Sequence, residues 1–187
     1  MKRIFLSIFA MALALATQAQ AIVDNAVIPV AVNVNSIMRM NVTSGGSIEF
    51  AFNTIDQYTN GIENTSRYDT KFTVASSVDF KVELAAEDQH LLGSDNPSHQ
   101  MALDLVAYEM EYNGSGQATS HNLPTGATQL SNTATTIVTA AGGDITANSY
   151  TIKWSCGVNG KASGSVLAAN LAPDRYSTNV FLVLSEQ

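Results

Sequence analysis

The sequence predicts an all-β protein built as an antiparallel β-sandwich, and three observations lead to this fold class. Apolar and polar residues alternate along most of the chain, as they do in strands with one buried face. Clusters of glycine, asparagine, serine and proline interrupt this alternation at short intervals. The 187 residues correspond to one domain of ordinary size, which is large enough to form a hydrophobic core without disulfides.

The composition limits the partners that the protein can have. The chain has 9 Lys and Arg against 16 Asp and Glu, a formal net charge of −7, and no basic run. Nucleic acid and anionic lipid select for clustered Lys and Arg, so we expect neither as a partner. Charged residues make up only 13% of the chain, which excludes coiled coils and charged disordered tails.

Residues 1–21 have the features of a secretory signal peptide. Lys2 and Arg3 precede an apolar run over residues 4–16, and small residues follow at the spacing that a signal peptidase recognises, so we predict cleavage after Ala21. The apolar run is shorter than the roughly 20 residues that a membrane-spanning helix needs, and no membrane insertion is expected. The mature protein is therefore predicted to be secreted.

The mature chain starts with a long alternating segment, residues 27–42. Its even-numbered positions from Ile28 to Val42 are apolar except for Ser36. Typical strands have about five or six residues, so we predict that residues 22–35 form an N-terminal extension and that residues 36–187 form the sandwich domain. Pro29 lacks a backbone donor, which suits an edge strand or an inserted strand better than a central one.

The remaining elements follow from the same alternation and turn signals. Seven further strands are predicted, at residues 47–52, 68–75, 78–84, 103–112, 134–140, 149–156 and 175–184. Residues 101–112 also have the composition of a helix, but Val106, Tyr108, Met110 and Tyr112 alternate with other residues, which favours a strand. No internal repeat and no linker between two domains is visible.

Cys156 is the only cysteine, so it cannot form an internal disulfide. It ends a predicted strand in which Tyr150, Ile152 and Trp154 lie on the same face. We expect a small buried side chain at this position, because free cysteine is among the most buried residue types. The alternative is a reactive or intermolecular thiol.

The sequence contains no convincing catalytic or metal-binding constellation. Residues 155–162 partly match a phosphate-binding loop but lack its first glycine and its magnesium-binding hydroxyl. His90, His99 and His121 have no partner at metal-ligand spacing, and we expect them in solvated loops. We therefore predict that the protein is not an enzyme and has no cofactor.

The two ends of the mature chain together resemble a known family. The alternating N-terminal segment and the C-terminal stretch from Leu171 to Leu184, with Pro173 ahead of Tyr176, resemble chaperone-usher fimbrial subunits and the related spore-coat-protein-U-like domains. This resemblance implies an immunoglobulin-like β-sandwich that lacks its last strand. An N-terminal extension of alternating apolar residues from one subunit would fill the gap in the next subunit.

The resemblance also assigns roles to individual residues and partners. The donor strand would be formed by Ile28, Val30, Val32 and Val34. The acceptor groove would be lined by Tyr176, Val180, Leu182 and Leu184. The partners would be copies of the same chain, with a periplasmic chaperone and an outer-membrane usher in transit, and the final location would be extracellular or at the cell surface.

Two functions remain open at this point. The first is a structural subunit of an extracellular fibre or surface layer, in which the donor strand of one copy completes another. The second is a self-contained secreted binding module, for example for glycans, in which residues 27–42 are two ordinary strands of one closed sandwich. The second function predicts an exposed aromatic platform, for which Trp154 and the tyrosines at positions 58, 68, 108 and 112 are the available side chains.

Overall fold

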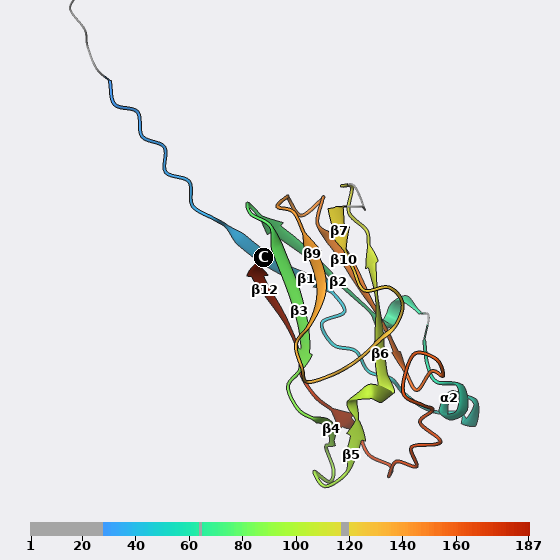
Figure 1. Ribbon diagram of the computed structural model, residues 1–187. Coiled ribbons are helices and arrows are strands. Elements are labelled where there is room, and N and C mark those ends of the chain that lie inside the picture. Colours follow the sequence, from blue (N-terminus) through green and yellow to red (C-terminus); the bar gives the residue numbers. More distant parts are fainter. Residues whose placement is uncertain (1–27, 64, 117–119) are drawn as a thin grey trace, which may run out of the picture. The chain divides into compact units, whose positions relative to one another are not determined.

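The computed structural model confirms an all-β protein, with antiparallel sheets and one short helix among the residues that it describes (Figure 1). It describes residues 28–63, 65–116 and 120–187, so the predicted signal peptide lies outside the described residues. The chain divides between Val34 and Asn35 into two units, which are described separately. The sheets belong to the second unit.

The second unit contains three sheets. The five-stranded sheet has the order β1 (Met38–Ser44), β2 (Asp69–Ser76), β10 (Ser149–Cys156), β6 (Val106–Tyr112) and β8 (Thr128–Gln129). The four-stranded sheet has the order β12 (Val180–Glu186), β3 (Phe80–Ala86), β9 (Thr135–Ala140) and β7 (His121–Asn122). The small sheet joins β11 (Tyr176–Ser177), β4 (His90–Gly93) and β5 (Gln100–Ala102).

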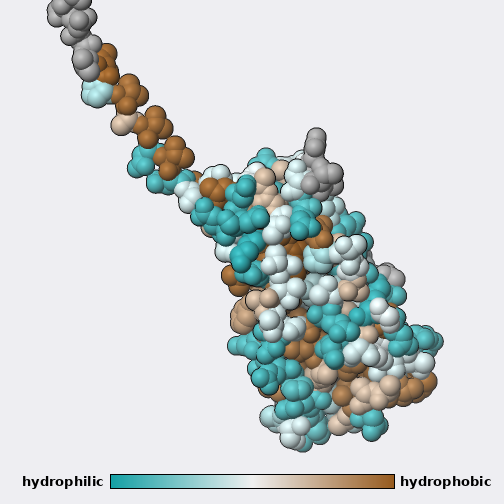
Figure 2. All heavy atoms as spheres, in the orientation of Figure 1, coloured by the Kyte–Doolittle hydropathy of each residue, from teal (hydrophilic) through white to brown (hydrophobic). Residues whose placement is uncertain are grey.

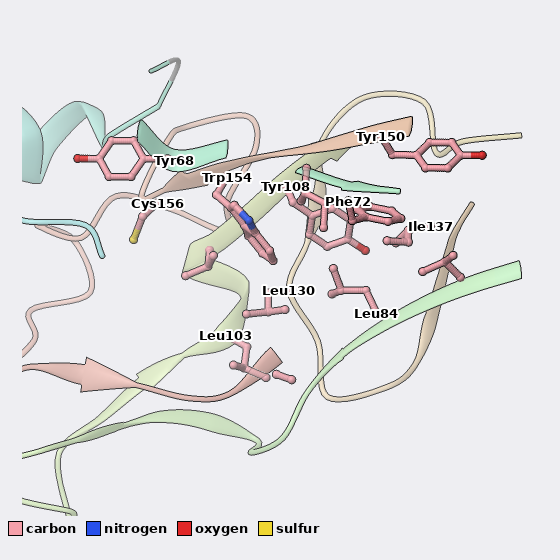
Figure 3. Packing of buried hydrophobic residues seen from close by; sticks show 14 of the residues in the cluster. Tyr68, Phe72, Leu84, Leu103, Tyr108, Leu130, Ile137, Tyr150, Trp154 and Cys156 are labelled. Atoms are coloured by element: carbon pink, nitrogen blue, oxygen red, sulfur yellow. The ribbon is translucent and has the colours of Figure 1, made fainter. Parts of the chain in front are cut away.

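The hydrophobic core lies between the five-stranded and the four-stranded sheet. Their inner strands alternate between buried and less buried residues, as half-buried strands do. Figure 3 shows Phe72 of β2 and Tyr150 of β10 close together, opposite Leu84 of β3 and Ile137 of β9. The rings of Phe72 and Tyr150 stack with their centroids 5.3 Å apart, and both side chains are fully buried. The two sheets therefore form a sandwich-like arrangement around one core.

Several predicted strands match the structure and others do not. The predictions for residues 68–75, 78–84, 134–140 and 149–156 are confirmed by β2, β3, β9 and β10. Residues 103–112 begin as a 3-10 turn, Leu103–Leu105, and continue as β6, so the strand prediction holds for the second half. The predicted strand at residues 175–184 is divided into β11 and β12, which join different sheets.

Two predictions near the start of the domain are wrong. Residues 47–52 contain no strand and lead into helix α2 (Ile55–Asn60) and the 3-10 turn Ser66–Tyr68. Thr54 caps α2 because its hydroxyl accepts the Gln57 amide, while the Gln57 side chain accepts the Thr54 amide. The capping box thus starts a helix just after residues 47–52, in a segment for which no helix was predicted. Of the predicted strand at residues 27–42, residues 28–42 are described, and in them strand structure begins only at Met38.

Candidate functional site

The apolar segment that precedes the sandwich has no secondary structure of its own. Residues 28–37 contain no helix or strand. The four predicted donor residues, Ile28, Val30, Val32 and Val34, are 81–84% exposed. Full burial of such a side chain is worth about 1.5–3 kcal/mol, so an exposed row of four is a strong candidate for contact with a partner. We call residues 28–34 the arm.

The C-terminal strand β12 forms one edge of the four-stranded sheet. It pairs with β3, and no other described strand lies on its opposite side. Val180, Leu182 and Leu184 pack against the core but remain partly exposed, whereas the core-facing residues of β3 are fully buried. The inner face of β12 is therefore covered next to β3, but it is incompletely covered along the edge that pairs with no described strand.

Backbone hydrogen bonds show which groups of β12 point to the open side. At the ends of its ladder, the Glu87 amide donates to the Asn179 carbonyl and the Gln187 amide donates to the Asp79 carbonyl. Antiparallel ladders alternate between bonded and non-bonded pairs, so the odd-numbered residues of β12 bond to β3. The N–H and C=O groups of the even-numbered residues point away from β3. These are the same residues whose apolar side chains face the core.

Strand β1 forms an equivalent edge on the five-stranded sheet. It pairs with β2, and the Ser77 amide donates to the Ile37 carbonyl at the start of this ladder. The odd-numbered residues of β1 therefore bond to β2, and the even-numbered residues point to the open side. The side chain of Met40 packs on the core and is partly exposed, while Met38 and Val42 on the same face are exposed.

The open edges of β1 and β12 lie next to each other (Figure 1). Their Cα atoms come within 8 Å at the nearest points. We call these two edges, with Met38, Met40, Val42, Val180, Leu182 and Leu184, the open side. Sequence reasoning missed the contribution of β1, although the even-numbered apolar positions continue from the arm into Met38, Met40 and Val42 and could have indicated it.

Of the four predicted acceptor residues, Tyr176 does not lie on the open strand. Val180, Leu182 and Leu184 share one face of β12, whereas Tyr176 belongs to β11 and pairs with Gly93 of β4. Its hydroxyl donates a hydrogen bond of 2.7 Å to the Ala172 carbonyl. Tyr176 therefore closes the turn that leads into β11, and its part in lining the acceptor groove stays a prediction.

The turn before β11 is held by the carboxylate of Asp174. The side chain of Asp174 is shielded from solvent and accepts hydrogen bonds from the amides of Asp95, Asn96 and Arg175 at 2.7–3.1 Å. The imidazole of His99 lies 2.9 Å away. The Asp95 amide, the largest favourable contact, and the other donors lower the pKa of Asp174 to about 2. This cluster fixes the point at which the chain enters β11, the short strand before β12.

We expect Asp174 to make the domain sensitive to acid. A carboxyl group with a lowered pKa stabilises the folded state fully above its unfolded pKa of about 3.9, and this contribution disappears as the pH falls through about 2. Thermal melting of wild type and Asp174→Asn at pH 7 and pH 2 measures this contribution to stability. Wild type should melt at a higher temperature than the variant at pH 7, and the difference should shrink at pH 2. An equal difference at both values would contradict this role.

A charged cluster covers the outer surface of the five-stranded sheet. The Lys161 ammonium lies 2.8 Å from carboxylate oxygens of both Glu63 and Glu109. Lys153 and Trp154 line the same small polar pocket, whose volume is about 170 Å³. Hydrogen bonds with Glu109 and Glu63 raise the pKa of Lys161, so it stays charged. The cluster ties the loops around residues 63 and 161 to β6.

Of the five aromatic side chains predicted for a glycan-binding platform, Tyr58 alone is exposed, at 36%. Trp154 is only 8% exposed, and its indole N–H donates to the Thr70 hydroxyl within the protein. Tyr68 and Tyr108 are also buried, and Tyr112 stacks on His121 with ring centroids 4.1 Å apart. Stacking on a sugar needs an exposed aromatic face. The structure offers little support for the second function.

The histidines and the cysteine have structural surroundings. His90 and His121 are not the loop residues that we predicted, because they lie in β4 and β7, and the Nδ1 of His121 is 2.8 Å from the Tyr150 hydroxyl. Cys156 is buried and unpaired, as expected, and burial raises the pKa of its thiol to about 12. The described part of the chain contains no group of three or more side chains placed to hold a metal ion.

Among the described residues, no helix combines the length and the apolar character that crossing a bilayer requires.

Comparisons with known proteins do not assign the chain to a family. No family model matches the chain, and no curated protein matches it with significant similarity.

Proposed function

We propose that this protein is a structural subunit of an extracellular fibre or surface layer, in which the arm of one copy inserts at the open side of another. The domain would be an immunoglobulin-like sandwich that lacks one strand, as in the chaperone-usher fimbrial subunits that the sequence resembles. The observation that carries the proposal is the combination, in one chain, of an exposed apolar arm and two strand edges with incompletely covered apolar residues.

Insertion would satisfy both partners at once. The open side offers unpaired backbone groups and partly exposed apolar side chains, and the arm offers an apolar residue at every second position. Four buried aliphatic side chains would contribute about 6–12 kcal/mol before the cost of ordering the arm. Each copy would then carry one donor and one acceptor, so the contact would propagate into a fibre.

The position of Pro29 agrees with pairing between the arm and β12. If the even-numbered side chains of the arm face the core, the even-numbered N–H groups point to one neighbouring strand and the odd-numbered groups to the other. Ile28, Val30, Val32 and Val34 all have an N–H to pair with β12. Pro29, which has none, is odd-numbered and faces the side of β1. A strand that is hydrogen-bonded to both β1 and β12 needs these two strands about 9.5 Å apart. Because their Cα atoms come within 8 Å at the nearest points, insertion would locally separate β1 from β12.

The export route follows from the same proposal. Residues 1–21 would direct the chain across the inner membrane, and a periplasmic chaperone and an outer-membrane usher would protect the arm and the open side before assembly. The mature subunit would end in the extracellular fibre.

Strand exchange is tested with full-length mature protein on denaturing gels without boiling. Wild type should give a ladder of multiples, because paired strands with a buried apolar face resist detergent. The variant Val30→Asn/Val32→Asn should give only the monomer band, since it places polar groups in the core. The matched control Ala31→Asn alters the opposite face of the arm and should keep the ladder. A wild-type monomer band, or a ladder in the double variant, would refute the proposal.

A further inference from the structure

The outer face of the four-stranded sheet has an unusual composition. Strand β12 is apolar on both faces, because Val180, Phe181, Leu182, Val183 and Leu184 follow one another. Phe181 and Val183 point outward and are 49% and 52% exposed. Runs of this kind are typical of strands that are covered on both sides. Figure 2 shows hydrophobic atoms at the rim of the molecule where Figure 1 places β12.

The neighbouring strands add few charges to this face. The register places Ala85 of β3 beside Phe181 and Glu83 beside Val183, and Thr136 of β9 lies beyond Glu83. Lys81 and Glu83 are the charged outward-facing residues of β3, β9 and β12 in the described chain, and they neutralise each other at 3.1 Å. We call Phe181, Val183, Ala85, Lys81, Glu83 and Thr136 the β12 face.

The outer surface of the other sheet is different. Its outward-facing positions include six charged side chains, Arg39, Asp69, Lys71, Lys153, Glu109 and Glu111. Interface centres are depleted of charged residues and enriched in aromatic ones, so the β12 face has the composition of a contact surface and the opposite sheet has that of a solvated surface.

We propose that the β12 face is a contact between two copies of this chain that meet with the same face. Two molecules of this acidic chain repel each other, and this face combines no net charge with exposed apolar groups. A face that is apolar and electrically neutral is complementary to itself, which permits a two-fold symmetric contact. The contact goes beyond strand exchange and does not require it. In a fibre, it would join copies of neighbouring fibres side by side.

The test uses the full mature chain carrying Val30→Asn/Val32→Asn, so that strand exchange does not contribute to the mass. Sedimentation over a range of concentrations should show a reversible dimer. Adding Phe181→Thr/Val183→Thr should raise the dissociation constant by at least about tenfold, because loss of central apolar contacts typically has this effect. Threonine keeps a high strand propensity, and thermal melting verifies that the variant is folded.

The matched control changes two other exposed apolar residues, Ile55→Thr/Leu167→Thr, and should leave the dissociation constant unchanged. A chain that stays monomeric up to about 1 mM, or a dimer that survives the Phe181/Val183 changes, would overturn the proposed contact. Failure of strand exchange would appear separately, as a missing ladder on unboiled denaturing gels. The detergent in these gels disrupts the contact between β12 faces, so this contact does not contribute to the ladder.

Discussion

Two variants that cannot polymerise alone should form a single dimer when they are mixed. The donor-defective variant is Val30→Asn/Val32→Asn, and the acceptor-defective variant is Leu182→Asn/Leu184→Asn on the partly exposed inner face of β12. In the mixture, the intact arm of the second variant inserts at the intact open side of the first. Growth then stops, because the remaining arm and the remaining open side are both defective. Unboiled denaturing gels should show one band of two copies.

The effect should be large, because each polar substitution removes about 1.5–3 kcal/mol of burial and adds the cost of burying an amide. Two such changes reduce strand exchange by more than about a thousandfold. The matched control Val183→Asn lies on the same strand but on its outer face, and it should keep the full ladder. A long ladder from the mixture, or no dimer from two folded variants, would show that the arm and β12 are not partners.

The substitution Phe72→Ala should strongly destabilise the domain. Phe72 is fully buried in β2 and stacks on Tyr150 of β10, so its removal leaves a cavity at the centre of the five-stranded sheet. Substitutions of this type cost about 3–5 kcal/mol. Urea unfolding of the donor-defective chain, followed by the fluorescence of the single tryptophan, Trp154, measures the change without a contribution from strand exchange.

The neighbouring substitution Lys71→Ala is the control for this measurement. Lys71 is exposed on the opposite face of β2, and its replacement should change the free energy of unfolding by less than about 0.5 kcal/mol. Equal effects of the two substitutions would mean that β2 does not contribute a buried face to the core.

The sequence predicted the strands that have one fully buried face. In β2 and β3, burial in the structure alternates residue by residue as the sequence pattern predicts. In β10 the predicted apolar face is buried, but Thr151 and Ser155 on the opposite face are buried as well. The sequence also indicated which face of the arm is apolar. It did not predict the short strands β4, β5, β7 and β8, because two to four residues are too few for a periodic pattern. It also missed α2, whose capping box acts over only four residues.

The candidate site was predictable in part. The apolar residues of the arm and of β12 were visible as alternating positions, but Tyr176 was assigned to the same strand because the alternation continues across the turn. Between β11 and β12 the chain is held by hydrogen bonds from the side chains of Thr178 and Asn179 to the carboxylates of Asp88 and Glu87, which connect residues 90 and 92 positions apart. A pattern read along the chain cannot detect such a contact.

The sequence by itself determined the all-β class, the apolar face of the long strands and the alternating apolar pattern of the arm, because side-chain periodicity is a local property of the chain. Only the tertiary structure decided which strands form edges. Strand β12 pairs with β3, almost 100 residues earlier, and β1 pairs with β2, and no further described strand pairs with either of them on the other side. The order of strands in a sheet depends on which distant segments pack together around a common core. The local sequence pattern does not reveal these long-range contacts.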